Sequence, residues 1–285
     1  MDPVSPEVAA TRARSWLFAP ATRPERFAKA AASGADRVIV DLEDAVAPEA
    51  KAAARSALGA AALPGGVPVY LRVNGADTSW FEEDLRAAAS LPIAGVVLPK
   101  AETPGQIARV RDALAVAGAR AAAAVVALVE TAAGVWNVLD LARAPGVERL
   151  AFGAIDFGLD AGVEGDGEEL AFARSRLVLA SRVAGIAPPI DAVTPAIDDE
   201  ARLVADLQRA RRYGFGGKLC IHPRQVAAVH RAFAPSPEDV AWARALLDAL
   251  ARIPEGERGA FAHGGAMVDR PVIDRARRIL ASAGG

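Results

Sequence analysis

Short apolar runs alternate along this chain with longer amphipathic stretches. Most of the runs are continuously apolar and stop at Gly, Pro or a charged residue, a pattern typical of strands that are buried on both faces. We therefore predict a strand at each run. The runs cover residues 15–18, 37–42, 67–73, 95–98, 123–129, 149–152, 190–193 and 217–221.

The segments between the runs carry apolar residues at helical spacing, as Leu203, Leu207 and Ala210 do. A strand followed by a helix, repeated about eight times, predicts a parallel sheet with right-handed crossovers. Eight such units in 285 residues favour an α/β fold with a closed (β/α)8 or TIM barrel over an open doubly wound sheet. The predicted helices cover residues 24–33, 49–62, 81–90, 103–117, 170–184 and 203–213.

The composition of the chain changes once, near the C-terminus. Residues 253–265 are rich in Gly and charged side chains, and a last predicted helix follows over residues 272–282. No long low-complexity linker separates this segment from the rest. We therefore predict a catalytic barrel over residues 12–251 and an appended lid or arm over residues 252–285.

Charge and cysteine content narrow the class of protein. The chain has 33 basic and 35 acidic residues, so its formal net charge of -2 provides no basic field for nucleic acid or an anionic membrane. Cys220 is the only cysteine, which excludes an internal disulfide and suits a reducing compartment. The N-terminus lacks the apolar run of a secretory signal, and the apolar stretch 121–128 is too short to span a bilayer. We expect a soluble, cytoplasmic protein.

Two carboxylates, Glu130 and Asp156, directly follow the fifth and sixth predicted strands. Chemistry in a barrel takes place at the carboxyl ends of the strands, and adjacent strands bring such residues close together. Two unpaired carboxylates raise each other's pKa, and a hard cation such as Mg2+ relieves the repulsion. Scattered histidines disfavour zinc. The alternatives are a helix N-cap for Asp156 and a structural ion pair for Glu130.

Two further strand-end residues are candidates for contact with a substrate. Arg72 ends the run VPVYLRVN, where a guanidinium can clamp a carboxylate, although a salt bridge to Glu43 or Asp44 is an equally good interpretation. Gly153 precedes Asp156 in the chain, and a small residue there would let backbone N–H groups approach a ligand oxygen. A tight turn is the competing interpretation of this glycine. We expect His222, by contrast, to pack or to cap.

Segments of this chain resemble, in the same order, those of the citrate lyase beta-subunit-like or HpcH/HpaI aldolase superfamily. The resemblance runs from about Arg14 to Ala251 and includes DLEDAV, ETAAG, FGAIDF and GKLCIHPRQ, which are specific in combination. The tail GGAMVDRPVIDRARRIL resembles the C-terminal arm of malyl-CoA and citramalyl-CoA lyases.

The resemblance implies a Mg2+-dependent carbon–carbon lyase. Such an enzyme cleaves or forms a 3-hydroxyacyl-CoA thioester, for example malyl-, citramalyl- or citryl-CoA, and the products are an acyl-CoA and a 2-oxo acid. It makes Glu130 and Asp156 the metal ligands, with Glu130 beside the substrate. Arg72 becomes the contact to the substrate carboxylate or carbonyl, in a retro-Claisen-type cleavage that passes through a thioester enolate.

The resemblance also assigns residues outside the strand ends. Arg23 and Lys29 match positions that touch the CoA nucleotide, and Asp269 matches an acid that a neighbouring subunit donates. It suggests a homotrimer or hexamer. The alternatives are a pyruvate-type class II aldolase that acts on free 2-oxo acids, a carrier-dependent citrate lyase beta subunit, and a ligand-binding barrel without activity.

Overall fold

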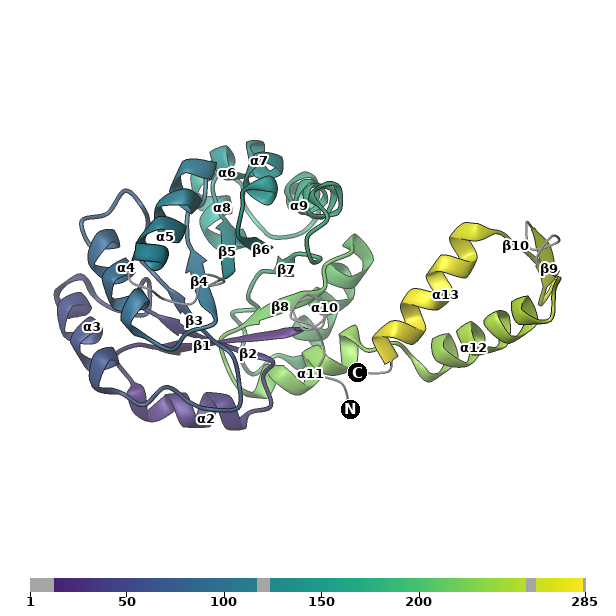
Figure 1. Ribbon diagram of the computed structural model, residues 1–285, viewed down its shortest axis with the longest axis horizontal. Coiled ribbons are helices and arrows are strands. Elements are labelled where there is room, and N and C mark those ends of the chain that lie inside the picture. Colours follow the sequence, from purple (N-terminus) through teal and green to yellow (C-terminus); the bar gives the residue numbers. More distant parts are fainter. Residues whose placement is uncertain (1–12, 117–123, 255–259, 284–285) are drawn as a thin grey trace. The chain divides into compact units, whose positions relative to one another are not determined.

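All the predicted apolar runs become strands of one closed parallel barrel, in the order β1 to β8 (Figure 1). The computed structural model describes residues 13–116, 124–254 and 260–283. β8 pairs with β1 through Ser15 and Lys218, which closes the ring and confirms the (β/α)8 prediction. The strands are β1 (Ser15–Pro20), β2 (Arg37–Asp41), β3 (Val69–Arg72), β4 (Gly95–Leu98), β5 (Ala124–Val129), β6 (Val147–Phe152), β7 (Ile190–Asp191) and β8 (Gly217–Cys220).

Helices follow the strands and surround them (Figure 1). The sequence analysis predicted most of the helices but missed α6, α7, α8, α11 and the helix over 237–251; the first three are only five, six and eight residues long. In the described ranges, none of the helices has the length and apolar character needed to cross a membrane. The helices are α2 (Phe27–Ala32), α3 (Lys51–Ala60), α4 (Phe81–Ser90), α5 (Pro104–Val116), α6 (Ala132–Trp136), α7 (Val138–Arg143), α8 (Ala154–Ala161), α9 (Ala171–Ala184), α10 (Glu200–Tyr213) and α11 (Arg224–Phe233), with the 3-10 turns η1 (Pro24–Arg26), η2 (Pro48–Ala50) and η3 (Glu168–Leu170).

Large apolar side chains fill the interior of the barrel. The rings of Trp16 and Tyr70 meet edge to face with their centroids 4.8 Å apart, and Val126, Ile190 and Leu219 belong to the same buried cluster. This packing makes the interior a solid core, as in other barrels of this kind. The polar residues at the carboxyl ends of the strands therefore stand on a rigid base.

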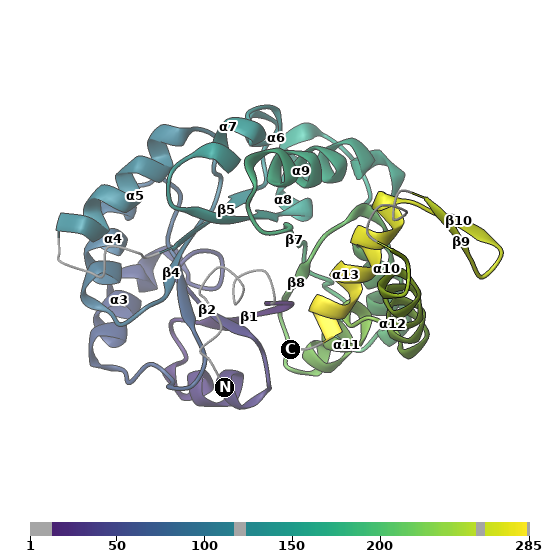
Figure 2. The ribbon, with the colours of Figure 1, turned by 45° about the vertical axis from the view of Figure 1, so that its right-hand side comes forward.

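The chain divides into two units, Met1–Ala232 and Phe233–Gly285. The second unit contains α12 (Pro237–Ala251), a hairpin of β9 (Phe261–His263) and β10 (Ala266–Val268), and α13 (Arg270–Ala283). Figure 2 shows α12 and α13 next to each other. The observed division precedes the expected boundary after residue 251, because the buried face of α12 packs with β10 and α13 in one apolar cluster.

Candidate active site

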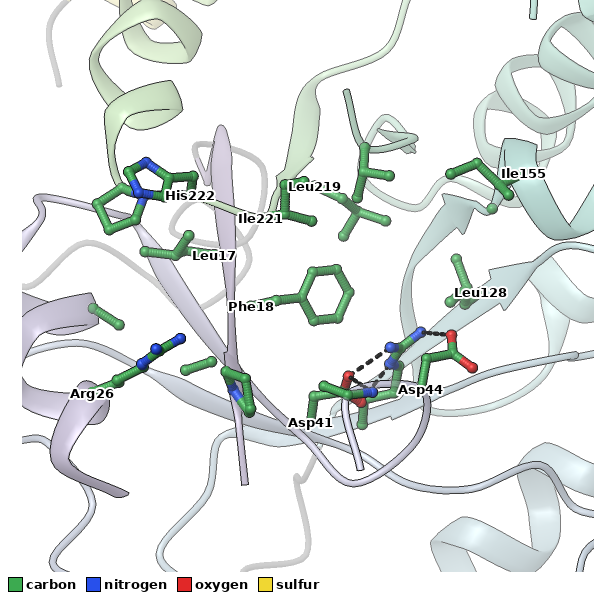
Figure 3. Close-up of a pocket in the computed structure, with 18 of the residues that line it drawn as sticks. Leu17, Phe18, Arg26, Asp41, Asp44, Leu128, Ile155, Leu219, Ile221 and His222 are labelled. Carbon is green, nitrogen blue, oxygen red and sulfur yellow. Dashed lines mark hydrogen bonds and ion pairs between the residues drawn. The ribbon is translucent and has the colours of Figure 1, made fainter. Parts of the chain in front are cut away.

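A cavity of about 1050 Å³ lies at the carboxyl ends of the barrel strands (Figure 3). Its wall contains charged side chains of both signs as well as apolar side chains. The acidic members are Glu25, Asp41, Asp44, Glu130 and Asp156, and the basic ones are Arg26, Lys29 and Arg72. Such a concave site with a few converging polar groups is typical of ligand-binding pockets.

Glu130 directly follows β5 and is buried at 2% exposure. Its Oε1 accepts a hydrogen bond from the backbone N–H of Lys100 at 2.9 Å. The pKa of Glu130 is raised to about 8, chiefly by burial and then by the nearby charges of Glu43 and Asp156; the Lys100 N–H and Arg72 act in the opposite direction. No ion pair to Glu130 occurs within the described residues, so the alternative of a structural ion pair is not observed.

Lys100 holds that N–H in place through an unusual backbone conformation. Its φ angle is 46°, which makes it the one described residue other than glycine with a positive φ. This left-handed conformation costs energy for a side chain with a Cβ, and such residues concentrate at functional sites. Its side-chain Nζ lies 4.0 Å from Glu43 Oε1. Lys100 thus links the carboxylates of Glu43 and Glu130.

Asp156 lies in the first turn of α8, close enough to Glu130 to raise its pKa. The helix is capped at Gly153 without a side-chain hydrogen bond, so the N-cap alternative for Asp156 is wrong. The positive end of the helix dipole favours a carboxylate at this place. Within the described residues, neither oxygen of Asp156 has a hydrogen-bond partner that would compete with a ligand.

The Glu130–Asp156 pair fits a hard divalent cation. The described residues contain no group of three or more His, Cys, Asp or Glu side chains that could hold a metal by themselves. A cation here would therefore take two carboxylates from the protein and its remaining oxygens from water or substrate, which is the arrangement Mg2+ adopts. A structural zinc site, which needs four protein ligands, does not fit.

Gly153 makes room for Glu130. Its own N–H donates to Val129 O at 3.0 Å, so this N–H is not one of the backbone groups that could approach a ligand oxygen. A Cβ built on Gly153 would lie 2.4 Å from Glu130 Oε2 and 2.6 Å from Glu130 Cβ. A glycine is needed because the Glu130 side chain occupies the space of a side chain at residue 153. The N–H groups of the first turn of α8, which start at Ala154, remain for a ligand.

Arg72 ends β3 and is held by three carboxylates (Figure 3). Its Nε and Nη2 donate to the two oxygens of Asp41, both at 2.7 Å. Its Nη1 donates to Asp44 Oδ2 at 3.2 Å and lies 2.8 Å from Glu43 Oε2. The salt-bridge alternative to Glu43 and Asp44 is thus observed, with Asp41 as the main partner. A guanidinium has five N–H groups, so one N–H of Nη2 remains for a substrate.

Glu43 is a buried carboxylate that the sequence analysis left without a role of its own. Burial raises its pKa to about 7, against the lowering influence of Arg72. Lys51 anchors the turn that carries it, donating to the carbonyl oxygens of Leu42 at 2.8 Å and of Glu43 at 2.7 Å. The cluster of three carboxylates in the segment DLED was the feature of the sequence that could have indicated a role for Glu43.

Of the three basic residues that follow β1, two line the cavity and one does not. Lys29 lines the cavity, as does Arg26, which the sequence analysis missed. Arg23 is not among the lining residues; its side chain is 60% exposed and lies 3.8 Å from Glu25. Arg26 and Lys29 are three residues apart, the spacing that places two side chains on one face of a helix. The spacing from Lys29 was therefore the feature of the sequence that could have identified Arg26 as a lining residue.

The two remaining candidates have capping contacts. His222 lines the cavity, and its Nδ1 accepts from the N–H of Arg224 at 3.2 Å, so the expected capping role is confirmed. Asp269 belongs to the C-terminal unit, where its Oδ1 accepts from the N–H of Val272 at 3.3 Å at the start of α13. Its catalytic role stays a prediction.

Residues 14–223 match the HpcH/HpaI aldolase/citrate lyase family. This chain belongs to that family. The citrate lyase subunit beta-like protein of Deinococcus radiodurans is 41% identical over 276 residues, which cover 94% of this chain and 96% of that protein. Family membership agrees with the closed barrel and with the strand-end carboxylates.

Relatives with more specific names point to CoA thioesters. In Cereibacter sphaeroides, an L-malyl-CoA/beta-methylmalyl-CoA lyase is 32% identical over 301 residues, covering 95% of this chain and 94% of the relative. A (3S)-malyl-CoA thioesterase of that species is 32% identical over 275 residues, covering 95% and 94%. The CitE protein of Mycobacterium tuberculosis, crystallised with magnesium, acetoacetate and coenzyme A, matches with a TM-score of 0.83 and 38% identity over 97% of this chain and 100% of that chain.

Proposed function

We propose that this family member is a Mg2+-dependent carbon–carbon lyase that cleaves or forms a 3-hydroxyacyl-CoA thioester, with an acyl-CoA and a 2-oxo acid as the other partners. The Glu130–Asp156 pair carries the proposal, because its partly unpaired carboxylates face a cavity at the end of the barrel where chemistry occurs. The names of the malyl-CoA lyase and of the magnesium- and CoA-bound structure support it.

We assign roles in this reaction to Glu130, Asp156, Arg72 and the start of α8. A bound Mg2+ would supply Lewis-acid stabilisation of the oxygen that becomes the 2-oxo group. Glu130 and Asp156 would hold the ion, and the remaining N–H of Arg72 would donate to a carboxylate or carbonyl oxygen of the substrate. The N–H groups at the start of α8 would stabilise negative charge that develops on the thioester oxygen.

The nucleotide part of the CoA thioester would meet the basic wall after β1. Lys29 was expected there, and Arg26 lines the same cavity. Two cations on one helical face suit phosphate oxygens. We therefore assign this contact to Arg26 and Lys29, with Arg23 outside the cavity.

The decisive experiment distinguishes cleavage of the carbon–carbon bond from hydrolysis of the thioester. Malyl-, citramalyl- and citryl-CoA are incubated with the protein, with and without Mg2+, and both the 2-oxo acid and free CoA thiol are measured. A lyase releases a 2-oxo acid and no thiol. Release of thiol without 2-oxo acid would instead identify a thioesterase, the second candidate, which the name of one relative favours. Cleavage of free 2-oxo-acid aldols without CoA would identify the aldolase alternative.

The surface of the barrel suggests self-association. Trp136, Leu159 and Phe172 are 71%, 84% and 60% exposed. They project from α6, α8 and α9; α6 contacts both of the other helices, and the Arg176 guanidinium lies 5.7 Å from the rings of both Trp136 and Phe172. Exposed apolar clusters of this kind mark interaction sites. We infer that this face binds a second copy of the chain in a homotrimer or hexamer.

An oligomer would allow Asp269 to act in trans as the acid that protonates the enolate carbon. We expect Asp269→Asn to lower kcat by about 10²- to 10⁴-fold, the range for a general acid, with CoA affinity nearly unchanged. Mixed oligomers of Glu130→Gln and Asp269→Asn chains, each inactive alone, should regain about a quarter of wild-type activity, since one kind of neighbouring pair contains both intact groups.

The matched control mixes Glu130→Gln with Asp156→Asn, two changes in the same barrel, and should regain nothing. Size-exclusion chromatography verifies that the mixed chains assemble. An unchanged kcat of Asp269→Asn would remove this residue from the mechanism. Activity in the control mixture would show that the recovery does not depend on an acid from another chain.

Binding of Mg2+ should release a proton from Glu130. Because burial raises the pKa of Glu130 to about 8 and a metal ligand must be ionised, binding at pH 7 should release about one proton. Apparent Mg2+ affinity should rise about fivefold from pH 7 to pH 8, by about a further twofold to pH 9, and level off above that. Calorimetric titrations in buffers with different ionisation enthalpies measure the number of protons released when Mg2+ binds. Zero release at pH 7 would contradict a protonated Glu130.

A further inference from the structure

The lower part of the cavity is an apolar floor formed by Phe18, Leu128, Val193 and Leu219. Leu128 and Leu219 are 2% and 4% exposed and belong to the buried core of the barrel, and Phe18 and Val193 pack against that core. Figure 3 shows the Phe18 ring pointing into the middle of the cavity, with Leu219 and Ile221 on one side and Leu128 on another. These four side chains therefore present an apolar surface to a ligand in the cavity.

The guanidinium of Arg72, which lies next to this floor, is already paired with carboxylates. The Arg72 guanidinium carbon lies 4.8 Å from the centroid of the Phe18 ring. Asp41, Glu43 and Asp44 all pair with Arg72, so three carboxylates surround one guanidinium. The remaining N–H of Nη2 can donate one hydrogen bond, but it cannot neutralise a further carboxylate held between Arg72 and the floor.

The other two cations of the wall, Arg26 and Lys29, come from segments outside the barrel strands. Arg26 and Lys29 come from η1 and α2, and both are exposed to solvent. Figure 3 shows Arg26 and His222 at one side of the cavity, with Phe18 between them and Leu128. A ligand group that rests on Leu128 and Leu219 therefore meets apolar surface and no unpaired cation from the lining residues.

We propose that Phe18, Leu128, Val193 and Leu219 select a 2-oxo acid whose substituent is hydrogen or a short alkyl group, and that they disfavour one with a second carboxylate. This inference rests on the proposed lyase function and names the substrate class of the same site. A methyl group on an apolar surface gains affinity of about 10- to 200-fold relative to its absence. A carboxylate placed there loses its hydration without gaining a partner.

Direct binding tests this preference without turnover. The Mg2+-loaded protein is titrated with pyruvate, 2-oxobutyrate and freshly dissolved oxaloacetate, whose decarboxylation is followed in parallel. We expect pyruvate or 2-oxobutyrate to bind with a Kd about 100-fold or more below that of oxaloacetate. Equal affinity, or tighter binding of oxaloacetate, would overturn the preference. Binding of none of the three would remove the proposed function and the preference together.

A substitution in the floor tests whether these side chains cause the selection. Val193 is only half-buried, so Val193→Lys can add a cation at the floor without filling the core. We expect Val193→Lys to shift the ratio of pyruvate to oxaloacetate affinity at least about tenfold towards oxaloacetate, the worth of one charge-assisted hydrogen bond. Val193→Met, a control of similar length without charge, should leave oxaloacetate weak. An unchanged ratio in Val193→Lys overturns the assignment of selectivity to the floor.

Discussion

Replacing Glu130 with glutamine should lower Mg2+-dependent cleavage of the CoA thioester by about 10³-fold or more. A Lewis-acidic ion supplies several kcal/mol of transition-state stabilisation, and each 1.4 kcal/mol corresponds to a tenfold rate. The described residues contain no group of three or more potential metal ligands, so Glu130 and Asp156 would be the two carboxylate ligands of the ion, and the loss of either would remove one of the two. The measurement is kcat/KM as a function of Mg2+ concentration, together with Mg2+ binding by calorimetry.

The stability of the variant separates loss of the metal from misfolding. Without Mg2+, Glu130 has a pKa of about 8 in the folded protein and its usual value of 4.5 in the unfolded chain. Between pH 4.5 and about pH 8, the folded protein therefore keeps a proton on Glu130 that the unfolded chain has released. The group therefore lowers the free energy of unfolding as pH rises through that window. Metal-free Glu130→Gln lacks this effect, so its unfolding temperature should equal or exceed that of the wild type above pH 8.

Two comparisons make this first result decisive. Asp156→Asn should behave as Glu130→Gln does, whereas Glu164→Gln, a matched change of an exposed acid in the loop after α8, should leave activity and Mg2+ binding unchanged. If Glu130→Gln loses activity but binds Mg2+ with wild-type affinity, the metal assignment is wrong. Full activity of Glu130→Gln would exclude this residue from the site.

Substituting alanine for Gly153 should produce the second large effect. The new Cβ would lie 2.4 Å from Glu130 Oε2 and 2.6 Å from Glu130 Cβ, closer than real Cβ atoms approach any neighbour. The Glu130 side chain or the start of α8 must move, and a shift of about 1 Å in a reacting group can cost about 10²-fold in rate. We expect Mg2+ affinity and kcat/KM each to fall about 100-fold, with a stability loss of about 1–3 kcal/mol from overpacking.

Gly59→Ala is the matched control for this substitution. Gly59 lies in α3 on the exposed surface, and a Cβ there has no neighbour within 4 Å. Alanine should stabilise that helix by about 0.5–1 kcal/mol and leave Mg2+ binding unchanged. Unfolding curves and metal titrations of both variants provide the comparison. Wild-type Mg2+ affinity in Gly153→Ala would show that Glu130 does not need the space beside Gly153.

The strands and the pair of carboxylates at their ends were predictable from the chain alone. A strand buried on both faces must be apolar along most of its length, so most strands appeared as continuous apolar runs that stop at Gly, Pro or a charged residue. Because all strands of a parallel barrel end on the same side, Glu130 and Asp156 had to face the same space. The short helices α6 to α8 were missed, since one or two turns provide too few positions to show a helical period.

The contacts of the same residues were not predictable in this way. For Arg72 the sequence left a substrate clamp and a salt bridge open, and the structure shows a paired guanidinium with one N–H remaining. The pairing follows from strand register, which sets Asp41 beside Arg72 in β2 and β3. A small residue at Gly153 was expected to let backbone N–H groups approach a ligand; the N–H of Gly153 itself bonds to Val129 O, and the Glu130 side chain requires the space that a larger residue would fill.

The sequence by itself determined the barrel, the order of its strands and the side on which Glu130 and Asp156 lie, because burial and chain direction depend on local pattern. Only the tertiary structure decided what those carboxylates face. Phe18, Leu128 and Leu219 come from β1, β5 and β8, far apart along the chain, and closure of β8 onto β1 brings them into one floor. The preference for an uncharged 2-oxo acid substituent depends on that closure, since no local pattern records which side chains meet across the interior of a barrel.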